Sequence, residues 1–134
     1  MATIAEDLRT FLLVDQDITA LVDGRVHQAK MPEQSRYPAV WFARAGRNEP
    51  LDLDGTGGLT QHRFDLECLS TDLAQAEDLA DATWSYLHGH RGTFGTRSVQ
   101  GVFLSDQDED YIPRGAAGDD GIHAVAIAAV IWST

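Results

Sequence analysis

The sequence predicts an α+β fold in which helices pack on one face of an antiparallel or mixed β-sheet with long inter-strand loops. Two amphipathic helical patterns open the chain, a clear two-residue alternation follows at residues 59–69, and a second helical pattern precedes the last strands. This order of elements is typical of an antiparallel sheet with segregated helices. The 134 residues predict a single domain, residues 1–134, because domains commonly contain roughly 100 to 200 residues.

The first predicted element is a helix from Thr3 to Val14. Thr3 and Glu6 have the spacing of a capping box. A second, short helix is predicted with Asp17 as its N-cap and an end at Gly24, which suits the left-handed position after a helix. The apolar residues expected to be buried by the two helices are Ile4, Leu8, Phe11, Leu12, Ile18, Leu21 and Val22. The pair is expected to form a helical lid.

The sheet is predicted to begin after this lid. A short strand is expected at residues 25–29, followed by a loop that contains Pro32 and Pro38. Residues 39–45 have the β-branched and aromatic composition of a strand. Residues 46–58 are rich in glycine and predict a long connection.

Residues 59–69 predict a strand with two different faces. One face carries Phe64, Leu66 and Cys68, and the other carries Arg63, Asp65 and Glu67. One face of the sheet therefore meets water or a partner. The longest helix is predicted from Thr71 or Asp72 to His88, with Gly89 as its stop. Its apolar stripe, expected to pack across the sheet, is Leu73, Ala76, Leu79, Ala80, Thr83 and Leu87.

Two strands are predicted in the last third of the chain, at residues 98–104 and 122–132, around a long acidic loop at residues 105–121. The final strand is apolar on both faces. This pattern predicts a central place in the sheet, or a second face packed against a neighbouring subunit.

The charge balance argues against a nucleic-acid ligand. The chain has 10 Lys and Arg against 21 Asp and Glu, which gives a net charge of −11. Affinity for DNA or RNA depends largely on basic side chains that replace counterions at phosphates. The acids concentrate locally at residues 106–110, where a solvated charged face or a docking surface is expected.

The cellular environment is predicted from cysteine use and from apolar runs. The single Cys68 favours a reducing compartment, and we expect synthesis in the cytoplasm. The N-terminus does not have the pattern of a signal peptide. No apolar run approaches the roughly 20 residues that span a bilayer, so no membrane partner is predicted.

No motif predicts catalysis, a cofactor or a metal. Cys68 lies on an apolar strand face, without an activating base in a recognisable pattern. The five histidines lack metal-ligand spacing, although His62 and His123 could pair across the sheet. Asp52 and Asp54 are spaced like the start of a calcium loop, but the remaining acids are missing, so a turn is the preferred interpretation.

The order of segments resembles the tail completion or tail terminator proteins of long-tailed phages, prophages and gene transfer agents. The resemblance rests on the helical start EDLRTFLLVDQDITALVDGRV, the PAVWF strand, and the strand and helix FDLECLSTDLAQAEDLADATWSYLHGHRGTFG. It continues through VQGVFLSDQDEDY to a closing apolar strand that ends in Trp132. The order and spacing of these patterns are what make the resemblance specific.

The resemblance implies a non-enzymatic structural subunit of the virion tail, at its head-proximal end. Such proteins typically form a ring of six copies that caps the tail tube, stops its polymerisation and contacts a head–tail connector or stopper protein. A monomer in free solution is compatible with this role, and DNA is expected to pass the lumen without specific binding. Residues at which we expect interfaces are Asp52, Asp54, Asp106, Asp108, Glu109, Asp110, Tyr111, Ile131 and Trp132.

Two alternatives remain at this point. The first is another structural role in the same particle, as a head–tail adaptor or a minor tail protein. The second is a small metal-dependent enzyme that uses Asp52 and Asp54 with nearby histidines. An origin in a lytic phage, a prophage or a gene transfer agent is also left open.

Overall fold

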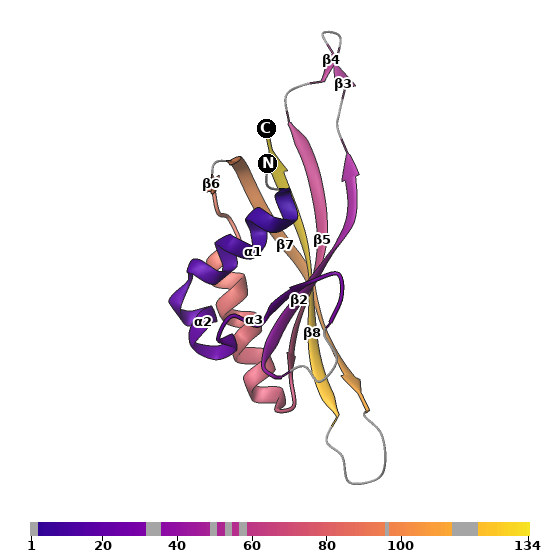
Figure 1. Cartoon of the computed structure of the whole chain (residues 1–134). Helices are drawn as coiled ribbons and strands as arrows, with labels where there is room; N and C mark the ends of the chain where they lie inside the picture. The colour runs from indigo at the N-terminus through magenta and orange to yellow at the C-terminus, as the bar shows by residue number, and fades with distance from the viewer. Residues whose placement is uncertain are drawn as a thin grey trace.

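A mixed six-stranded sheet carries three helices on one face (Figure 1). The computed structural model describes residues 3–31, 36–48, 51–52, 55–56, 59–95, 97–113 and 121–134. Figure 1 shows an elongated molecule in which β2 and β5 extend beyond the helices at one end, and β7 and β8 extend at the other. None of the described helices is long and apolar enough to cross a membrane.

The two N-terminal helices are joined through a capping residue. Helix α1, Ile4–Val14, begins as predicted, because the Thr3 hydroxyl accepts a hydrogen bond of 3.1 Å from the Glu6 amide. Helix α2 is Gln16–Val22, and its N-cap is Asp15, whose carboxylate accepts from the Ile18 amide at 3.2 Å. The prediction of Asp17 as N-cap was therefore wrong. A cap bonds the amide three residues ahead, which leaves Asp17 in the first turn, where its charge complements the helix dipole.

The sheet has the order β1-β2-β5-β8-β7-β6, with β1 parallel to β2 and all other pairs antiparallel. This confirms the predicted α+β class. The central position of β8 also confirms the prediction from its apolar faces. The six strands are β1 Val26–Gln28, β2 Ala39–Asn48, β5 Thr60–Ser70, β6 Gly92–Phe94, β7 Arg97–Ile112 and β8 Ile122–Ser133. A separate two-stranded hairpin contains β3 Leu51–Asp52 and β4 Gly55–Thr56.

Two predicted strand ends were wrong, because pairing with a neighbouring strand continues each strand beyond the residues whose composition indicated it. Strand β2 continues through Gly46 to Asn48, with a register shift between Arg44 and Gly46. Strand β7 continues to Ile112, so residues 105–112 of the segment predicted as a loop are strand, paired with the long apolar β8. The segment RGTFG, for which no strand was predicted, contributes the edge strand β6.

The main core lies between the helices and one face of the sheet. Helix α3, Leu73–Leu87, buries Ala76, Leu79, Ala80, Thr83 and Leu87 there, as predicted. Leu73 was predicted on the same stripe but is 36% exposed, because it lies at the first turn, beyond the edge of the sheet contact. Phe11 of α1 stacks on Tyr86 of α3 at 4.6 Å and on Phe94 of β6 at 4.3 Å between ring centroids.

A second, smaller core lies on the opposite face of the sheet, which we call the open face. Leu69, Ile122 and Ala124 are buried there beneath Met31, Tyr37 and Trp41. Met31 and Tyr37, which lie between β1 and β2 in the sequence, thus cover part of the open face.

Candidate functional site

The acidic residues predicted at an interface lie along β7 and point to both faces of the sheet. Asp108 and Asp110 pair with Ala126 and Ala124 and so share the open face, whereas Glu109 pairs with Val125 and lies on the helix side. All three are exposed. Asp106 has a left-handed backbone with φ of 54° inside a β-bulge between Ser105 and Asp108. Tyr111 is 49% exposed, and its ring lies 4.9 Å from that of His123.

A shallow acidic groove of about 410 Å³ crosses the open face. Its lining residues are Trp41, Asp65, Glu67, Asp106, Asp108, Ala126, Ile127 and Ala128. Ala126 and Ala128 have short side chains, so the sheet surface is lower at these positions. Burial raises the pKa of Glu67, and the charges of Asp110 and Asp65 raise it further. The groove is therefore strongly electronegative, and a cationic side chain on a partner would relieve this repulsion.

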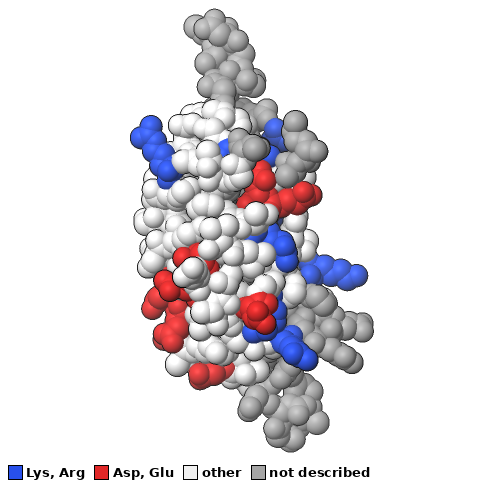
Figure 2. Space-filling model, turned by 60° about the vertical axis from the view of Figure 1, so that its left-hand side comes forward, with Lys and Arg blue, Asp and Glu red and all other residues white. Residues whose placement is uncertain are grey.

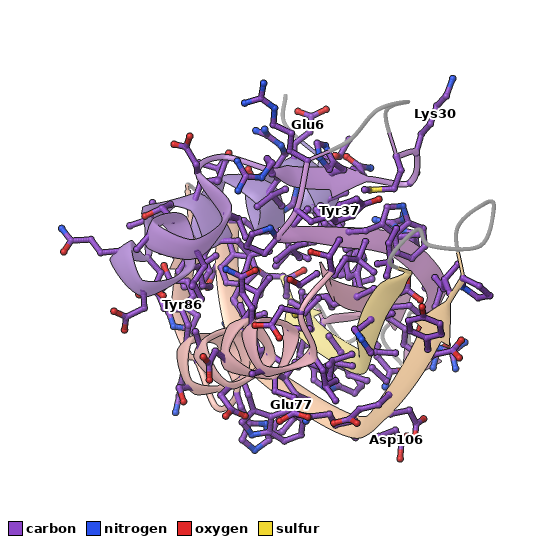
Figure 3. The ribbon with its side chains drawn as sticks, turned by 90° about the horizontal axis from the view of Figure 1, so that it is seen from below. Glu6, Lys30, Tyr37, Glu77, Tyr86 and Asp106 are labelled. Atoms are coloured by element: carbon purple, nitrogen blue, oxygen red, sulfur yellow. The ribbon has the colours of Figure 1, made fainter. Side chains whose placement is uncertain are left out.

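A second acidic cluster joins α3 to β7 on the helix side. A hydrogen bond to Glu109 raises the pKa of Glu77, and the charge of Glu109 adds to the effect. Figure 3 shows Glu77 on α3, and Figure 2 shows acidic side chains gathered at the lower left of the helix-bearing side.

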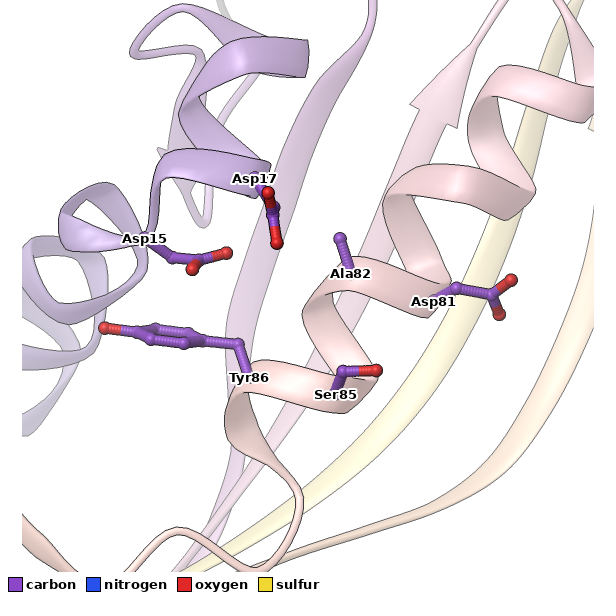
Figure 4. A pocket seen from close by; sticks show the side chains of 6 residues that line it. All are labelled: Asp15, Asp17, Asp81, Ala82, Ser85 and Tyr86. Atoms are coloured by element: carbon purple, nitrogen blue, oxygen red, sulfur yellow. The ribbon is translucent and has the colours of Figure 1, made fainter.

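A cleft of about 350 Å³ separates α2 from α3 (Figure 4). It is lined by Asp15, Asp17, Asp81, Ala82, Ser85 and Tyr86. Asp15 caps α2, and the Tyr86 hydroxyl donates a hydrogen bond of 2.8 Å to the Phe11 carbonyl. Burial raises the pKa of Tyr86, and the charge of Asp15 raises it further. These two polar groups are engaged in holding the helices together, which is a structural role.

The opposite end of the sheet is basic. A groove of about 400 Å³ is lined by Thr3, Ile4, Arg44, Arg47, Thr60, His62, Arg97, Ser133 and Thr134. Arg97 donates to the Asp7 carboxylate at 2.9 Å, and the Arg44 guanidinium lies 5.8 Å from the centroid of the Phe64 ring. The residues of this groove come from distant segments of the chain, and for this reason the sequence did not reveal the cluster.

The remaining predicted interface residues are distributed unevenly. Ile131 is fully buried in the main core, whereas Trp132 is half-buried on the open face, so only Trp132 is available at the surface. Asp52 belongs to β3, and Asp54 lies outside the described residues. The calcium-loop interpretation of this segment is therefore not tested.

His62 and His123, which the sequence allowed to pair across the sheet, do not face each other. His62 lies opposite Ile131 and His123 lies opposite Ser70, toward different ends of β5. Both histidines lie near the start of a strand, but the pairing register decides which residues face each other, and the sequence does not reveal that register. Within the part of the chain that the structure describes, no three or more His, Cys, Asp or Glu side chains are grouped to hold a metal.

Cys68 is fully buried against α3, as its place on the apolar strand face predicted. Its sulfur lies 3.8 Å from the Thr83 hydroxyl. Burial raises the pKa of the Cys68 thiol to about 12. The thiol is therefore protonated at neutral pH and is inaccessible to a substrate.

Comparison with known proteins identifies a family. The family model for tail completion protein gp17 matches residues 6–122, from α1 to the start of β8. A chain in the structure of the virion of a native gene transfer agent particle is 16% identical, with a TM-score of 0.65 and coverage of 100% of both chains. At this identity the structural match shows a shared fold. No curated protein matches the sequence.

Proposed function

The chain belongs to the tail completion protein gp17 family, and on this basis we propose that it forms the ring that terminates a phage tail. Membership makes the protein a structural assembly component of the virion tail. The proposed ring caps the tail tube, stops its polymerisation and presents a surface to a head connector or stopper protein. The family match over residues 6–122 is the observation that carries this proposal.

Two features of the surface support the proposed ring. A closed ring is held by a heterologous contact, in which two different patches of each subunit meet. The acidic groove with the β7 segment and the basic groove lined by Arg44 and Arg97 are two such patches. The net charge of −11 also suits a lumen that DNA must cross without binding, because acidic side chains repel phosphates.

Electron microscopy of particles assembled with and without this protein tests the proposal. We expect overlong tails, or tails unattached to heads, when the protein is absent. Supplying the protein from a plasmid is expected to restore tails of uniform length, which controls for effects on neighbouring genes. Tails of normal length that remain joined to heads in its absence would contradict the proposal, and a role as adaptor or minor tail protein would then be preferred.

A further inference from the structure

Two strand segments at opposite ends of the sheet have an edge without a partner strand among the described residues. Strand β1 pairs with β2 only at Val40–Phe42, and β6 pairs with β7 only at Arg97–Val99. We call Ala43–Asn48 the β2 arm and Asp106–Ile112 the β7 arm. Each such edge presents backbone N–H and C=O groups that can bond a further strand.

The edge of β7 just before its arm is hydrogen-bonded to residues that follow α3. The Gly89 amide donates to the Val102 carbonyl at 2.8 Å, and the Leu104 amide donates to Nδ1 of His88 at 3.0 Å. The residues after α3 thus occupy this edge in place of a strand. The open edge begins where this cover ends, at the bulge that contains Asp106.

The β2 arm carries basic side chains on the helix side of the sheet, and the neighbouring strand β5 adds one on the open face. Arg44 pairs with Phe64 and Arg47 with His62, which places both arginines on the helix side. On the open face, the Arg63 guanidinium lies over Gly46, where a Cβ would be only 2.6 Å from Nη2. The missing side chain of Gly46 lets the Arg63 charge reach the outer edge of β2.

The β7 arm is acidic on the same two faces. Glu109 lies on the helix side, and Asp108 and Asp110 lie on the open face. Paired strands keep their side chains on a common face of the sheet. The Arg44 side would therefore meet Glu109, and the Arg63 side would meet Asp108 or Asp110.

We propose that the β7 arm of one copy pairs with the β2 arm of a second copy, so that the sheet continues from subunit to subunit. This inference rests on the proposed ring. Within one copy β2, β5, β8 and β7 are successively antiparallel, so β2 and β7 run in opposite directions. Copies that keep the same orientation would thus pair the two arms as antiparallel strands, a known mode of strand addition.

The two arms lie at different heights along the sheet. Ala43, Asp65, Ala128 and Ser105 form one continuous row across the four strands. The β2 arm lies on one side of this row and the β7 arm on the other, at opposite ends of the molecule (Figure 1). Pairing the arms displaces neighbouring copies by about six residues, roughly 20 Å. A closed ring of strands accommodates such a stagger by tilting the strands from the ring axis.

The two arms occupy opposite edges of the sheet. One neighbouring copy therefore cannot pair with both arms of the same copy. Figure 3 shows Lys30, beside the β1–β2 edge, and Asp106, on β7, projecting from opposite sides of the molecule. Every chain of paired copies therefore ends in one β2 arm and one β7 arm that still lack a neighbouring copy. Closing the ring brings these two ends together.

Disulfide cross-linking in purified tails tests the pairing. Arg44→Cys is combined in turn with cysteine at Asp108, Glu109, Asp110 and Tyr111, and oxidised tails are analysed on denaturing gels without reductant. We expect a ladder that extends beyond the dimer for Glu109→Cys or Tyr111→Cys, at least fivefold stronger than for the open-face neighbours Asp108→Cys and Asp110→Cys.

The alternation distinguishes strand pairing from general proximity, because only one face of the β7 arm would meet Arg44. Cys68 contributes little background because it is fully buried. Equal cross-linking at all four positions, or none at any of them, overturns the pairing if immunoblotting finds the protein in the tails. Absence of the protein from purified tails would instead overturn the proposed function. A ladder confined to the helix-side positions would support both.

Discussion

At the residue scale, the carboxyl pair of Glu77 and Glu109 couples the fold to pH. The raised pKa of Glu77 means that the folded chain binds this proton more tightly than the unfolded chain. The contribution to stability is therefore present below the ordinary pKa of a glutamate and is lost as pH rises through the folded pKa. At neutral pH two carboxylates face each other across α3 and β7.

We expect Glu77→Gln to raise the melting temperature at pH 7, because it removes this repulsion and its amide can donate to Glu109. The gain should shrink below pH 4, where the raised pKa leaves the Glu77 carboxyl of the native protein protonated. Circular dichroism melts at the two pH values measure the difference. Asp78→Asn is the matched control, since it removes one charge from the same helix without the hydrogen bond to Glu109. An equal gain for both variants would contradict the pairing.

Cys68 is expected to resist alkylation in the folded protein. With a pKa of about 12, roughly one thiol in ten thousand is ionised at pH 8, and its burial excludes the reagent. Iodoacetamide labelling followed by mass spectrometry should find the native thiol unmodified after an hour and fully modified in guanidinium chloride. Rapid labelling of the native protein would show that the strand face behind α3 opens readily. The sequence predicted this burial because alternation in β5 places Cys68 beside Leu66.

At the element scale, local patterns located the helices well and the strand ends poorly. The helices are determined by short-range rules, such as the Thr3 cap and the Gly89 stop. The extension of β7 through the acidic residues 105–112 depends instead on pairing with β8, which comes later in the chain. An exposed edge strand has little apolar alternation to reveal it. The ends of these strands are therefore determined by pairing with distant segments, which the local composition does not reveal.

The Asp15 cap between α1 and α2 gives a test at this scale. Asp15→Ala is expected to cost about 1 kcal/mol of unfolding free energy, because the Ile18 amide loses its acceptor at a helix start. Asp17→Ala should cost clearly less, since it loses only a favourable interaction with the dipole. Urea denaturation of both variants compares the costs directly. A larger cost for Asp17→Ala would mean that the helix begins two residues later.

At the scale of the whole molecule, the sequence predicted the layer order but not the distribution of charge. The central place of β8 followed from its apolar faces. The basic groove gathers Arg44, Arg47 and Arg97 from distant segments, and only the sheet register brings them together. Likewise, alternation separates Ile131 from Trp132 without showing which face the helices cover. The two ends of opposite charge emerge only in the assembled fold.

The final prediction concerns variants in which the charge at one of the two arms is reversed. Arg44→Glu would place a carboxylate against Glu109 of the next copy, and Glu109→Lys would place an ammonium group against Arg44. Each variant alone should therefore lose most tail termination, because like charges would meet at every contact. A mixture of the two variants behaves differently. When the two variants alternate around the ring, two kinds of contact form. In one, the glutamate at position 44 meets the lysine at position 109, and in the other the native Arg44 meets the native Glu109. Both contacts are attractive.

Co-expression is therefore expected to restore tails of normal length, measured by electron microscopy, although neither variant does so alone. Alternation requires an even number of copies, such as the six that the family resemblance implies, and a heterologous contact at every interface. A second mixture, Arg91→Glu with Asp81→Lys, reverses exposed charges outside the two arms, and each of these variants should terminate tails normally by itself. If the Arg44 and Glu109 variants stay inactive when mixed, while both are incorporated into tails, the two arms do not meet in the ring.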